Sequence, residues 1–124
     1  MLQRILIIDD DEQLADAYKI YLSKHGYCVH CAHELEEAEA LLAHYEYSLV
    51  ITDLRLSKLG FGGLEIVKQI REKRLPTHIV VFTGYAWPEL KAEALAQNVD
   101  AFVRKPAKLS DLMETISTLT EASA

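Results

Sequence analysis

The sequence predicts a doubly wound α/β fold in which five buried parallel strands alternate with five helices. The apolar runs 5–8 and 49–51 contain no polar residue, which is typical of strands that helices cover on both faces. Apolar residues at helical spacing separate such runs, and this alternation gives a parallel sheet with right-handed crossovers. A chain of 124 residues, 50% of them hydrophobic, is long enough to bury a core as one domain.

The first half of the chain carries three strands and two helices. After the strand at 5–8, apolar residues at helical spacing predict a helix near 12–25, and Gly26 follows it as a C′ residue. A segment rich in β-formers predicts the second strand, and an amphipathic pattern with intervening glutamates predicts the second helix. These two elements are expected at residues 27–32 and 35–44, and the third strand at 48–53.

The second half begins with an irregular segment, residues 54–63, whose three glycines let a chain turn through positive φ, and we expect a mobile loop beside the site there. Prolines mark the later helices. Pro76 ends the third helix because the residue before a proline disfavours helical angles, and Pro88 suits the first turn of the fourth. The expected elements are a helix at 64–74, a strand at 78–82, a helix from 88, a strand at 100–104 and a last helix with Ser110 as its N-cap.

Composition and charge exclude several classes of function. The formal net charge of −6 argues against an electrostatic nucleic-acid or membrane surface, because those surfaces need clustered positive charge. No apolar run approaches the roughly 18–20 residues of a membrane span, and residues 1–4 show no signal-peptide pattern. We therefore expect a cytoplasmic protein without direct nucleic-acid contact or membrane association.

Cys28 and Cys31, with His30 and His33 close by, have a C-x-x-C spacing that a redox or zinc site could also show. In a strand, residues three apart point to opposite faces and lie about 10 Å apart, beyond the roughly 7 Å limit for a disulfide. A redox pair usually opens a helix, and no second ligand pair completes a zinc site. We interpret both residues as ordinary strand cysteines.

Carboxylates gather at the predicted ends of the first and third strands, where open α/β sheets place their ligand sites. Asp9, Asp10 and Asp11 follow the first strand, and Asp53 ends the third. Their charges repel by roughly 1 kcal/mol per pair at 4 Å in water and about 4 kcal/mol at an effective dielectric of 20, which favours a bound cation. The oxygen ligands indicate Mg²⁺ rather than Ca²⁺. The alternative, a helix N-cap, needs only one acid.

Further polar residues follow the last two strands: Thr83 after the fourth and Lys105-Pro106 after the fifth. Together with Asp9-Asp10 and Asp53, they give a pattern that resembles the receiver domains of two-component response regulators, in particular single-domain, chemotaxis-regulator-like receivers. The resemblance covers essentially the whole chain and implies a flavodoxin-like, three-layer (βα)5 sandwich with strand order 2-1-3-4-5. It implies one receiver domain over residues 1–124. No output domain is expected, because the chain stops soon after its fifth helix.

The resemblance also implies a role for each carboxylate. Asp53 is the implied phosphoacceptor, which takes the phosphoryl group from a phosphohistidine of a sensor histidine kinase or a histidine phosphotransfer protein. Asp9, Asp10 and Asp53, with the backbone carbonyl of Arg55, are implied to hold Mg²⁺, for which Mn²⁺ can substitute. Asp10 is expected to be a direct ligand and Asp9 to act through water, whereas Asp11 remains a surface or helix-start charge.

Lys105 is implied to pair with Asp53 or its phosphoryl group, next to a cis Lys105-Pro106 bond, and Thr83 to donate its hydroxyl to a phosphoryl oxygen. Phosphorylation would draw Thr83 inward and let Phe102 rotate into the vacated space. This changes the face of the fourth helix, fifth strand and fifth helix, where a downstream protein is expected to bind. We expect a monomer or a weak phosphorylation-dependent dimer, and no enzyme activity beyond its own phosphorylation and dephosphorylation.

The chain departs from the usual receiver pattern in several places. Ser57 stands where the family usually has proline, and the glycine-containing loop is about two residues longer than usual. Arg55 and Tyr85 occupy positions that tune dephosphorylation in the family. A long cation and an aromatic ring there can shield the phosphoryl group from water, so we expect a slowly decaying phosphoform. Ala107 stands where an aromatic residue commonly follows the lysine-proline pair.

Two other classes of protein share parts of this pattern. Residues 9–11 contain the Asp-x-Asp of a small haloacid-dehalogenase-like phosphatase, in which Asp9 would be the nucleophile and Mg²⁺ the cofactor. Gln13 replaces the Thr or Val expected two residues later, and the chain leaves little room for a cap domain. The second alternative is a pseudo-receiver that binds partners without being phosphorylated. The complete set of acids, threonine and lysine favours the phosphorylated receiver.

Overall fold

The computed structural model describes residues 2–56, 60–84 and 87–122 of the chain. In chain order, its elements are β1 (Arg4–Ile8), α1 (Glu12–Lys24), β2 (Cys28–Ala32), α2 (Leu35–His44), β3 (Leu49–Thr52), α3 (Gly62–Glu72), β4 (His78–Thr83), α4 (Pro88–Ala96), β5 (Ala101–Arg104) and α5 (Leu109–Ala122). Every predicted strand and helix is present, with boundaries close to those expected from the sequence.

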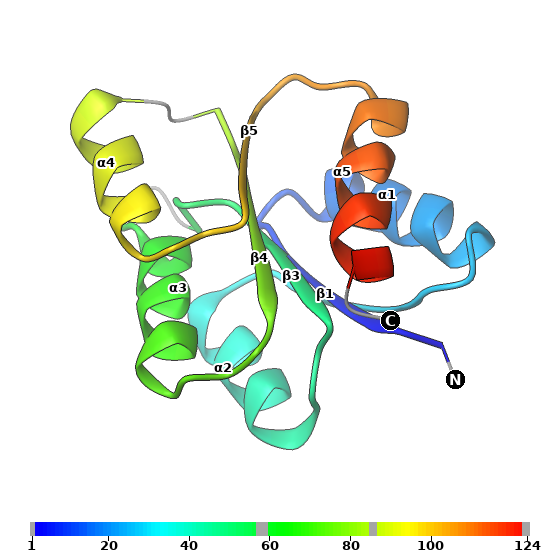
Figure 1. Ribbon diagram of the computed structural model, residues 1–124, viewed down its shortest axis with the longest axis horizontal. Helices are drawn as coiled ribbons and strands as arrows, with labels where there is room; N and C mark the ends of the chain where they lie inside the picture. The colour runs from blue at the N-terminus through cyan, green and yellow to red at the C-terminus, as the bar shows by residue number, and fades with distance from the viewer. Residues whose placement is uncertain (1, 57–59, 85–86, 123–124) are drawn as a thin grey trace.

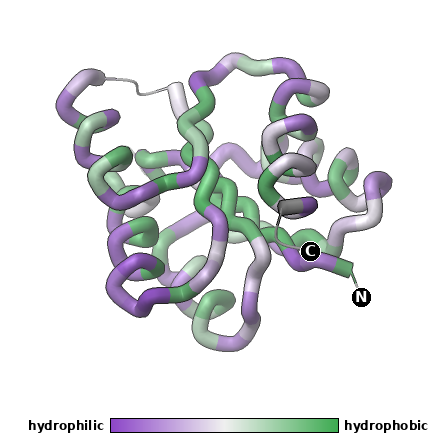
Figure 2. Tube along the Cα trace, in the orientation of Figure 1, coloured by the Kyte–Doolittle hydropathy of each residue, from purple (hydrophilic) through white to green (hydrophobic). Residues whose placement is uncertain are grey.

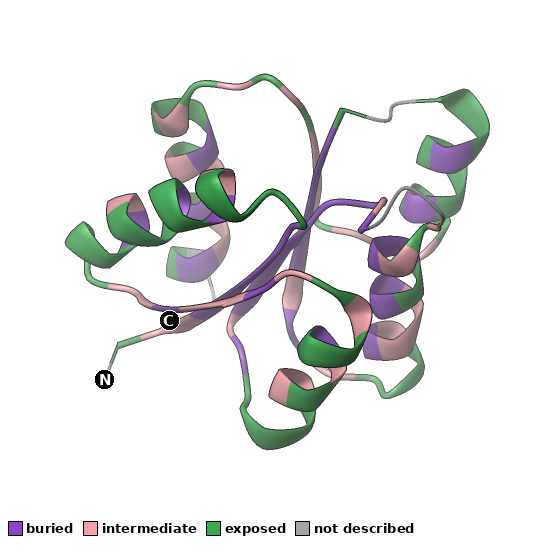
Figure 3. Cartoon of the chain, turned by 180° about the vertical axis from the view of Figure 1, so that it is seen from behind, coloured by how far each residue is buried: buried purple, intermediate pink, exposed green. Residues whose placement is uncertain are grey.

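The five strands form one parallel sheet in the order β2-β1-β3-β4-β5, which confirms the predicted topology. Figures 1 and 3 show the three layers of the flavodoxin-like sandwich: α1 and α5 cover one face of the sheet, and α2, α3 and α4 cover the other. All strands run in the same direction. Their C-terminal ends, and the residues that follow them, therefore meet at one edge of the sheet.

Two hydrophobic clusters make the core, one on each face of the sheet. Along β1, Leu6 and Ile8 enter the cluster beneath α2–α4, while Ile5 and Ile7 enter the cluster beneath α1 and α5. This explains the unbroken apolar run, because a strand covered on both faces has no solvent-facing position. Figure 2 shows the hydrophobic residues concentrated along the strands. None of the helices in the described part of the chain combines the length and apolar character that crossing a bilayer requires.

Both ends of α1 follow the predicted local chemistry. Asp11 is the N-cap, and its Oδ1 accepts the N–H of Leu14 at 3.1 Å, which confirms it as a helix-start charge. Gly26 has a φ of 92°, a left-handed conformation that glycine adopts without a steric penalty. The start of the chain's first crossover is therefore set by residues that were identifiable from the sequence.

The start of α5 differs from the prediction, which was wrong in making Ser110 the N-cap. The helix begins at Leu109, and the N–H of Leu112 donates to the carbonyl of Lys108 at 3.1 Å. Ser110 thus lies inside the first turn. A serine before an apolar-periodic run indicates a helix start to within a residue or two, since several neighbouring positions can close the first turn.

The described glycines after β3 do not use the positive φ that glycine permits, because Gly26 is the single glycine with positive φ among the described residues. α3 begins at Gly62, so the pair Gly62-Gly63 lies in its first turn. Gly63 is needed for space: a Cβ there would lie 1.5 Å from the carbonyl oxygen of Asp53. The Gly63 N–H donates to the Leu54 carbonyl at 3.1 Å. The start of α3 therefore packs directly on the end of β3.

Cys28 and Cys31 are free, half-buried cysteines of β2, as predicted. The Sγ of Cys31 lies 3.8 Å from the carbonyl oxygen of Ala15, in the cluster beneath α1. Burial raises the pKa of the Cys31 thiol to about 11. A thiol that stays protonated at neutral pH is a poor nucleophile and a poor metal ligand, so the structure gives no support to a redox or zinc site here.

Candidate functional site

The candidate site lies at the edge of the sheet where four strands end. Asp9 follows β1, Asp53 follows β3, Thr83 is the last residue of β4, and Lys105 follows β5. The strand pairing extends into the site, since the N–H of Lys105 donates to the carbonyl of Thr83 at 2.9 Å. Side chains that are distant in the sequence therefore begin from neighbouring strand ends.

Asp53 is buried, with 6% of its surface exposed, and donors reach both carboxylate oxygens. The hydroxyl of Thr83 donates to Oδ1 at 2.6 Å, and the backbone N–H of Arg55 donates to the same oxygen at 3.3 Å. Lys105 Nζ donates to Oδ2 at 2.9 Å. Charge-assisted hydrogen bonds hold the carboxylate in one orientation. Thr83, which was expected to move inward on phosphorylation, already contacts Asp53 in this structure.

Lys105 bridges two carboxylates, because its Nζ also lies 2.6 Å from Oδ2 of Asp9. The ammonium stands 5.3 Å from the ring centroid of Phe82. Burial alone would lower the pKa of Lys105, but hydrogen bonds and Coulomb attraction from Asp9 and Asp53 outweigh burial and raise that pKa. The side chain therefore stays a cation. The Lys105-Pro106 peptide bond that follows it is cis, as predicted.

Asp9 is the second buried carboxylate of the site, with 4% of its surface exposed. Its Oδ1 accepts the N–H of Asp11 at 3.0 Å, and its Oδ2 accepts from Lys105. Burial raises the pKa of Asp9, and the charge of Asp53 adds to the rise, while the bonds from Lys105 and Asp11 oppose it. The net rise follows mainly from burial, which disfavours the ionised carboxylate more than its hydrogen bonds and the Lys105 ammonium favour it.

Asp10, the expected direct metal ligand, lies exposed at the surface. Within the described ranges, no three acidic, histidine or cysteine side chains converge as a metal-binding group, so the structure does not bring Asp10 together with Asp9 and Asp53. The chemistry of the donors still fits a hard divalent cation. Two buried carboxylates share the ammonium of Lys105, and a third carboxylate is adjacent in sequence.

The expected switch and tuning residues are only partly within the described chain. Phe102 is half-buried on β5, packs against the cluster beneath α4, and has Lys91 Nζ 5.3 Å from its ring centroid. Arg55 is half-buried, and its N–H contacts Asp53. Tyr85 and Ser57 lie outside the described residues. Of the expected switch and tuning residues, the structure therefore describes Thr83, Phe102 and Arg55.

Two neighbours of the site were missing from the sequence predictions. The ring of Phe82 lies beside Lys105, and Nδ1 of His33 lies 3.1 Å from the backbone carbonyl oxygen of Asp9. The position of Phe82, next to Thr83 on a strand adjacent to the one that leads into Lys105, was a usable signal. His33 gave no such signal, because its contact with Asp9 depends on the orientation of the imidazole ring, which the sequence does not reveal.

A doubly wound sheet with an aspartate, a threonine and a lysine at its C-terminal edge is the arrangement expected of the receiver domains that the sequence resembles. The family model for the response regulator receiver domain matches residues 5–117 of this chain. The chain belongs to this family, as its resemblance predicted.

Curated relatives are longer than this chain. It is 28% identical over 121 residues to the transcriptional regulatory protein DltR of Streptococcus agalactiae serotype III (strain NEM316), covering 98% of this chain and 53% of DltR. It is 29% identical over 116 residues to the response regulator protein PilR of Pseudomonas aeruginosa, covering 94% of this chain and 26% of PilR. The chain therefore spans about half the length of DltR and about a quarter of PilR.

Solved structures show the same fold. A CheY-like response regulator receiver domain protein from Methanospirillum hungatei JF-1 is 31% identical, with a TM-score of 0.90 and both chains fully covered. A response regulator from Burkholderia pseudomallei with a phosphorylated aspartic acid, calcium ion and citrate is 26% identical, with a TM-score of 0.84, covering 98% of this chain and 70% of that one. TrrA of Thermotoga maritima, in complex with Mg(2+)-BeF, is 29% identical, with a TM-score of 0.82, covering 95% and 99%.

This chain is thus a receiver domain of two-component response regulators, a class of phosphoproteins in phosphorelay signal transduction. The comparisons give no support to a haloacid-dehalogenase-like phosphatase or to a pseudo-receiver.

Proposed function

We propose that this domain accepts a phosphoryl group on Asp53 from a phosphohistidine of a sensor histidine kinase or a histidine phosphotransfer protein. The supporting observation is the buried Asp53 carboxylate, set between the Thr83 hydroxyl at 2.6 Å and Lys105 Nζ at 2.9 Å. In the transfer, the phosphorus–nitrogen bond breaks, the histidine nitrogen keeps the electron pair, and a phosphorus–oxygen bond forms to Asp53.

Lys105 and Thr83 serve the phosphoryl oxygens once they are in place. Phosphorylation adds roughly −1.5 to −2 charge, which a lysine cation and a hydroxyl donor stabilise. Both groups already contact Asp53, so little reorganisation is needed to present them to the developing charge. The domain catalyses only its own phosphorylation and dephosphorylation, because these residues act on a group attached to their own chain.

Mg²⁺ is the proposed metal, with Mn²⁺ as a substitute, held by Asp9, Asp10, Asp53 and the backbone carbonyl of Arg55. When bound, it supplies positive charge that neutralises the carboxylates and the phosphoryl oxygens. Calcium and Mg(2+)-BeF in two related receiver structures support a divalent ion in general. The two buried carboxylates, Asp9 and Asp53, which share the single ammonium of Lys105, support such an ion in this chain.

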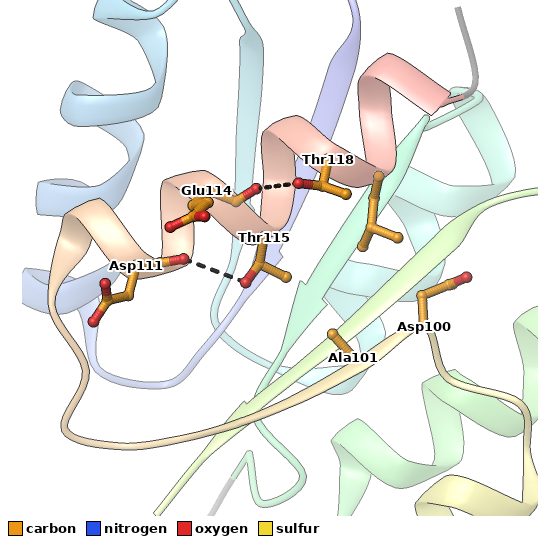
Figure 4. Close-up of a pocket in the computed structure, with 7 residues that line it drawn as sticks. Asp100, Ala101, Asp111, Glu114, Thr115 and Thr118 are labelled. Carbon is orange, nitrogen blue, oxygen red and sulfur yellow. Dashed lines mark hydrogen bonds between the residues drawn. The ribbon is translucent and has the colours of Figure 1, made fainter.

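The downstream partner is proposed to be a protein that binds the face of α4, β5 and α5, with Phe102 linking that face to Thr83. Figure 4 shows a groove on this face between the start of β5 and α5. It is lined by Asp100, Ala101, Asp111, Glu114, Thr115, Thr118 and Leu119. DltR is named a transcriptional regulatory protein, so we propose the absence of direct nucleic-acid contact for these 124 residues alone. We also propose that the domain is a monomer or a weak phosphorylation-dependent dimer.

The test is phosphorylation with acetyl phosphate or a kinase phosphodonor, with and without Mg²⁺, followed by mass spectrometry. We expect a Mg²⁺-dependent mass gain in the wild type, none in Asp53→Asn, and an unchanged gain in Asp16→Asn, which alters an exposed acid on α1. A gain that survives in Asp53→Asn contradicts the proposal. The decay of the phosphoform is followed after the donor is removed, and a half-life of seconds would contradict the proposed shielding by Arg55 and Tyr85.

A further inference from the structure

His33 lies at the C-terminal edge of the sheet, immediately after β2. Its ring contacts Asp9, the first residue of the acidic loop, which is the segment Asp9–Asp11 after β1. Nδ1 of His33 lies 3.1 Å from the backbone carbonyl oxygen of Asp9. A carbonyl oxygen can only accept, so the bond requires a proton on Nδ1, which then donates. The contact links residues 24 apart in sequence and joins the connection after β2 to the connection after β1.

The backbone that carries this ring is itself fixed. The N–H of His33 donates to Oε1 of Glu37, in the first turn of α2, at 2.6 Å. This is the reach-back of a helix-start glutamate, which satisfies a backbone donor just before the helix. On the other side, the N–H of Asp9 donates to the carbonyl of Ala32 at 3.0 Å. Hydrogen bonds therefore fix the backbone of His33, and its ring contacts the end of the neighbouring strand β1.

The bond from His33 is made to the backbone carbonyl oxygen of Asp9, whereas the other contacts of the site use the remaining polar atoms of that residue. The N–H pairs with Ala32, Oδ1 accepts from Asp11, and Oδ2 accepts from Lys105. The carbonyl of Asp9 and the nitrogen of the next residue belong to one planar peptide unit. The hydrogen bond to that carbonyl therefore sets the direction from which the residue after Asp9 begins, and that residue is the acid proposed to bind the metal directly.

We propose that His33 is a positioning residue for the metal-binding acidic loop, acting through the carbonyl of Asp9. It holds the peptide plane between Asp9 and Asp10, so that the backbone of Asp10 is already fixed when a cation arrives and only its side chain has to turn toward the ion. This inference rests on the metal-dependent phosphorylation proposed above. It gives a role to a histidine that the rejected C-x-x-C interpretation had left without one.

The test measures the Mg²⁺ dissociation constant of the unphosphorylated protein by calorimetry, and the thermal midpoint without Mg²⁺. Removing an outer-shell partner typically weakens metal binding about 10-fold to 100-fold, so we expect about a tenfold loss in His33→Ala. His33→Asn should bind nearly as the wild type does, because the asparagine Nδ2 occupies the place of Nδ1 and can donate. His44→Ala is the matched control, since Nδ1 of His44 contacts a carbonyl oxygen at 2.8 Å within its own helix.

His33→Leu, which keeps apolar bulk but cannot donate, replaces His33→Ala if the alanine variant does not fold. A lowered thermal midpoint with unchanged Mg²⁺ affinity would assign His33 a structural role and overturn the inference. So would a weakened affinity that His33→Asn fails to restore. A wild type that neither binds Mg²⁺ nor gains mass on Asp53 overturns the proposed function, and the inference with it. Wild-type binding with an unaffected His33→Ala overturns the inference alone.

Discussion

Two groups of ionisable side chains on the same sheet differ in charge: one contains buried carboxylates around a lysine, and the other a neutral histidine among tyrosine rings. At the C-terminal edge, Asp9 and Asp53 are buried as carboxylates around Lys105, and burial raises the pKa of Asp9. This group is charged and unbalanced. Its contacts hold the acids in place, but the protein environment as a whole disfavours the ionised form of Asp9.

The second group surrounds His30 on β2 and consists of rings. The His30 ring lies 4.7 Å from the Tyr45 ring and 5.6 Å from the Tyr47 ring, measured between centroids, and its Nδ1 is 2.7 Å from the Tyr47 hydroxyl. Burial lowers the pKa of His30, as do the charges of Arg4 and Lys19. The fold therefore keeps this histidine neutral and well packed. Unbalanced charge accompanies the chemistry, whereas the uncharged group contributes to stability.

The largest expected effect comes from removing the cation of the charged group. Lys105→Met should lower the free energy of unfolding at pH 7 by ~2 kcal/mol, because it leaves two buried carboxylates without their ammonium and Lys105 is itself partly exposed. The loss should shrink in acid, where the carboxylates take up protons. Denaturant unfolding across pH checks this, with the exposed Lys108→Met as control. An equal loss at pH 4 and pH 7 would contradict the charge argument.

A smaller loss is expected in the neutral group. Tyr47→Phe keeps the ring but removes the hydroxyl that bonds His30, and should cost about 1 kcal/mol of unfolding free energy. Phosphorylation of Asp53 should be unchanged, because the hydroxyl lies outside the site. Tyr45→Phe, which changes the hydroxyl of the partly exposed neighbouring ring, is the control. Reduced phosphorylation in Tyr47→Phe would show that the two groups are coupled.

The smallest effect has the opposite sign. Because the folded pKa of Asp9 is raised above its ordinary value, ionisation of Asp9 reduces stability as the pH rises through that folded pKa. Asp9→Asn should therefore be slightly more stable than the wild type at pH 7 in the absence of Mg²⁺. The gain should shrink as the pH falls toward 3.8, the ordinary pKa of an aspartate, because Asp9 of the folded chain becomes protonated above that pH. Thermal midpoints at pH 3.5 and pH 7 test this, and a less stable Asn variant at pH 7 would refute it.

The sequence was informative where one strand carries its own signal. Asp53 and Lys105 could be predicted because each lies at the end of a segment that reads as a strand, and the ends of parallel strands must meet at one edge of the sheet. The space requirement at Gly63 and the contact of His33 with Asp9 could not be predicted, because both depend on how elements pack after the sheet has formed. Ser110 failed for a local reason: neighbouring residues compete to close a helical turn.

The close approach at Gly63 has a consequence for how this domain can change over time or by engineering. A Cβ atom at Gly63 would lie only 1.5 Å from the carbonyl oxygen of Asp53. The first turn of α3 therefore packs directly against the backbone of the proposed phosphoacceptor. A one-residue slip of α3 that brought Leu64 to this position would drive its side chain into the Asp53 backbone, so the junction restricts the register of the helix.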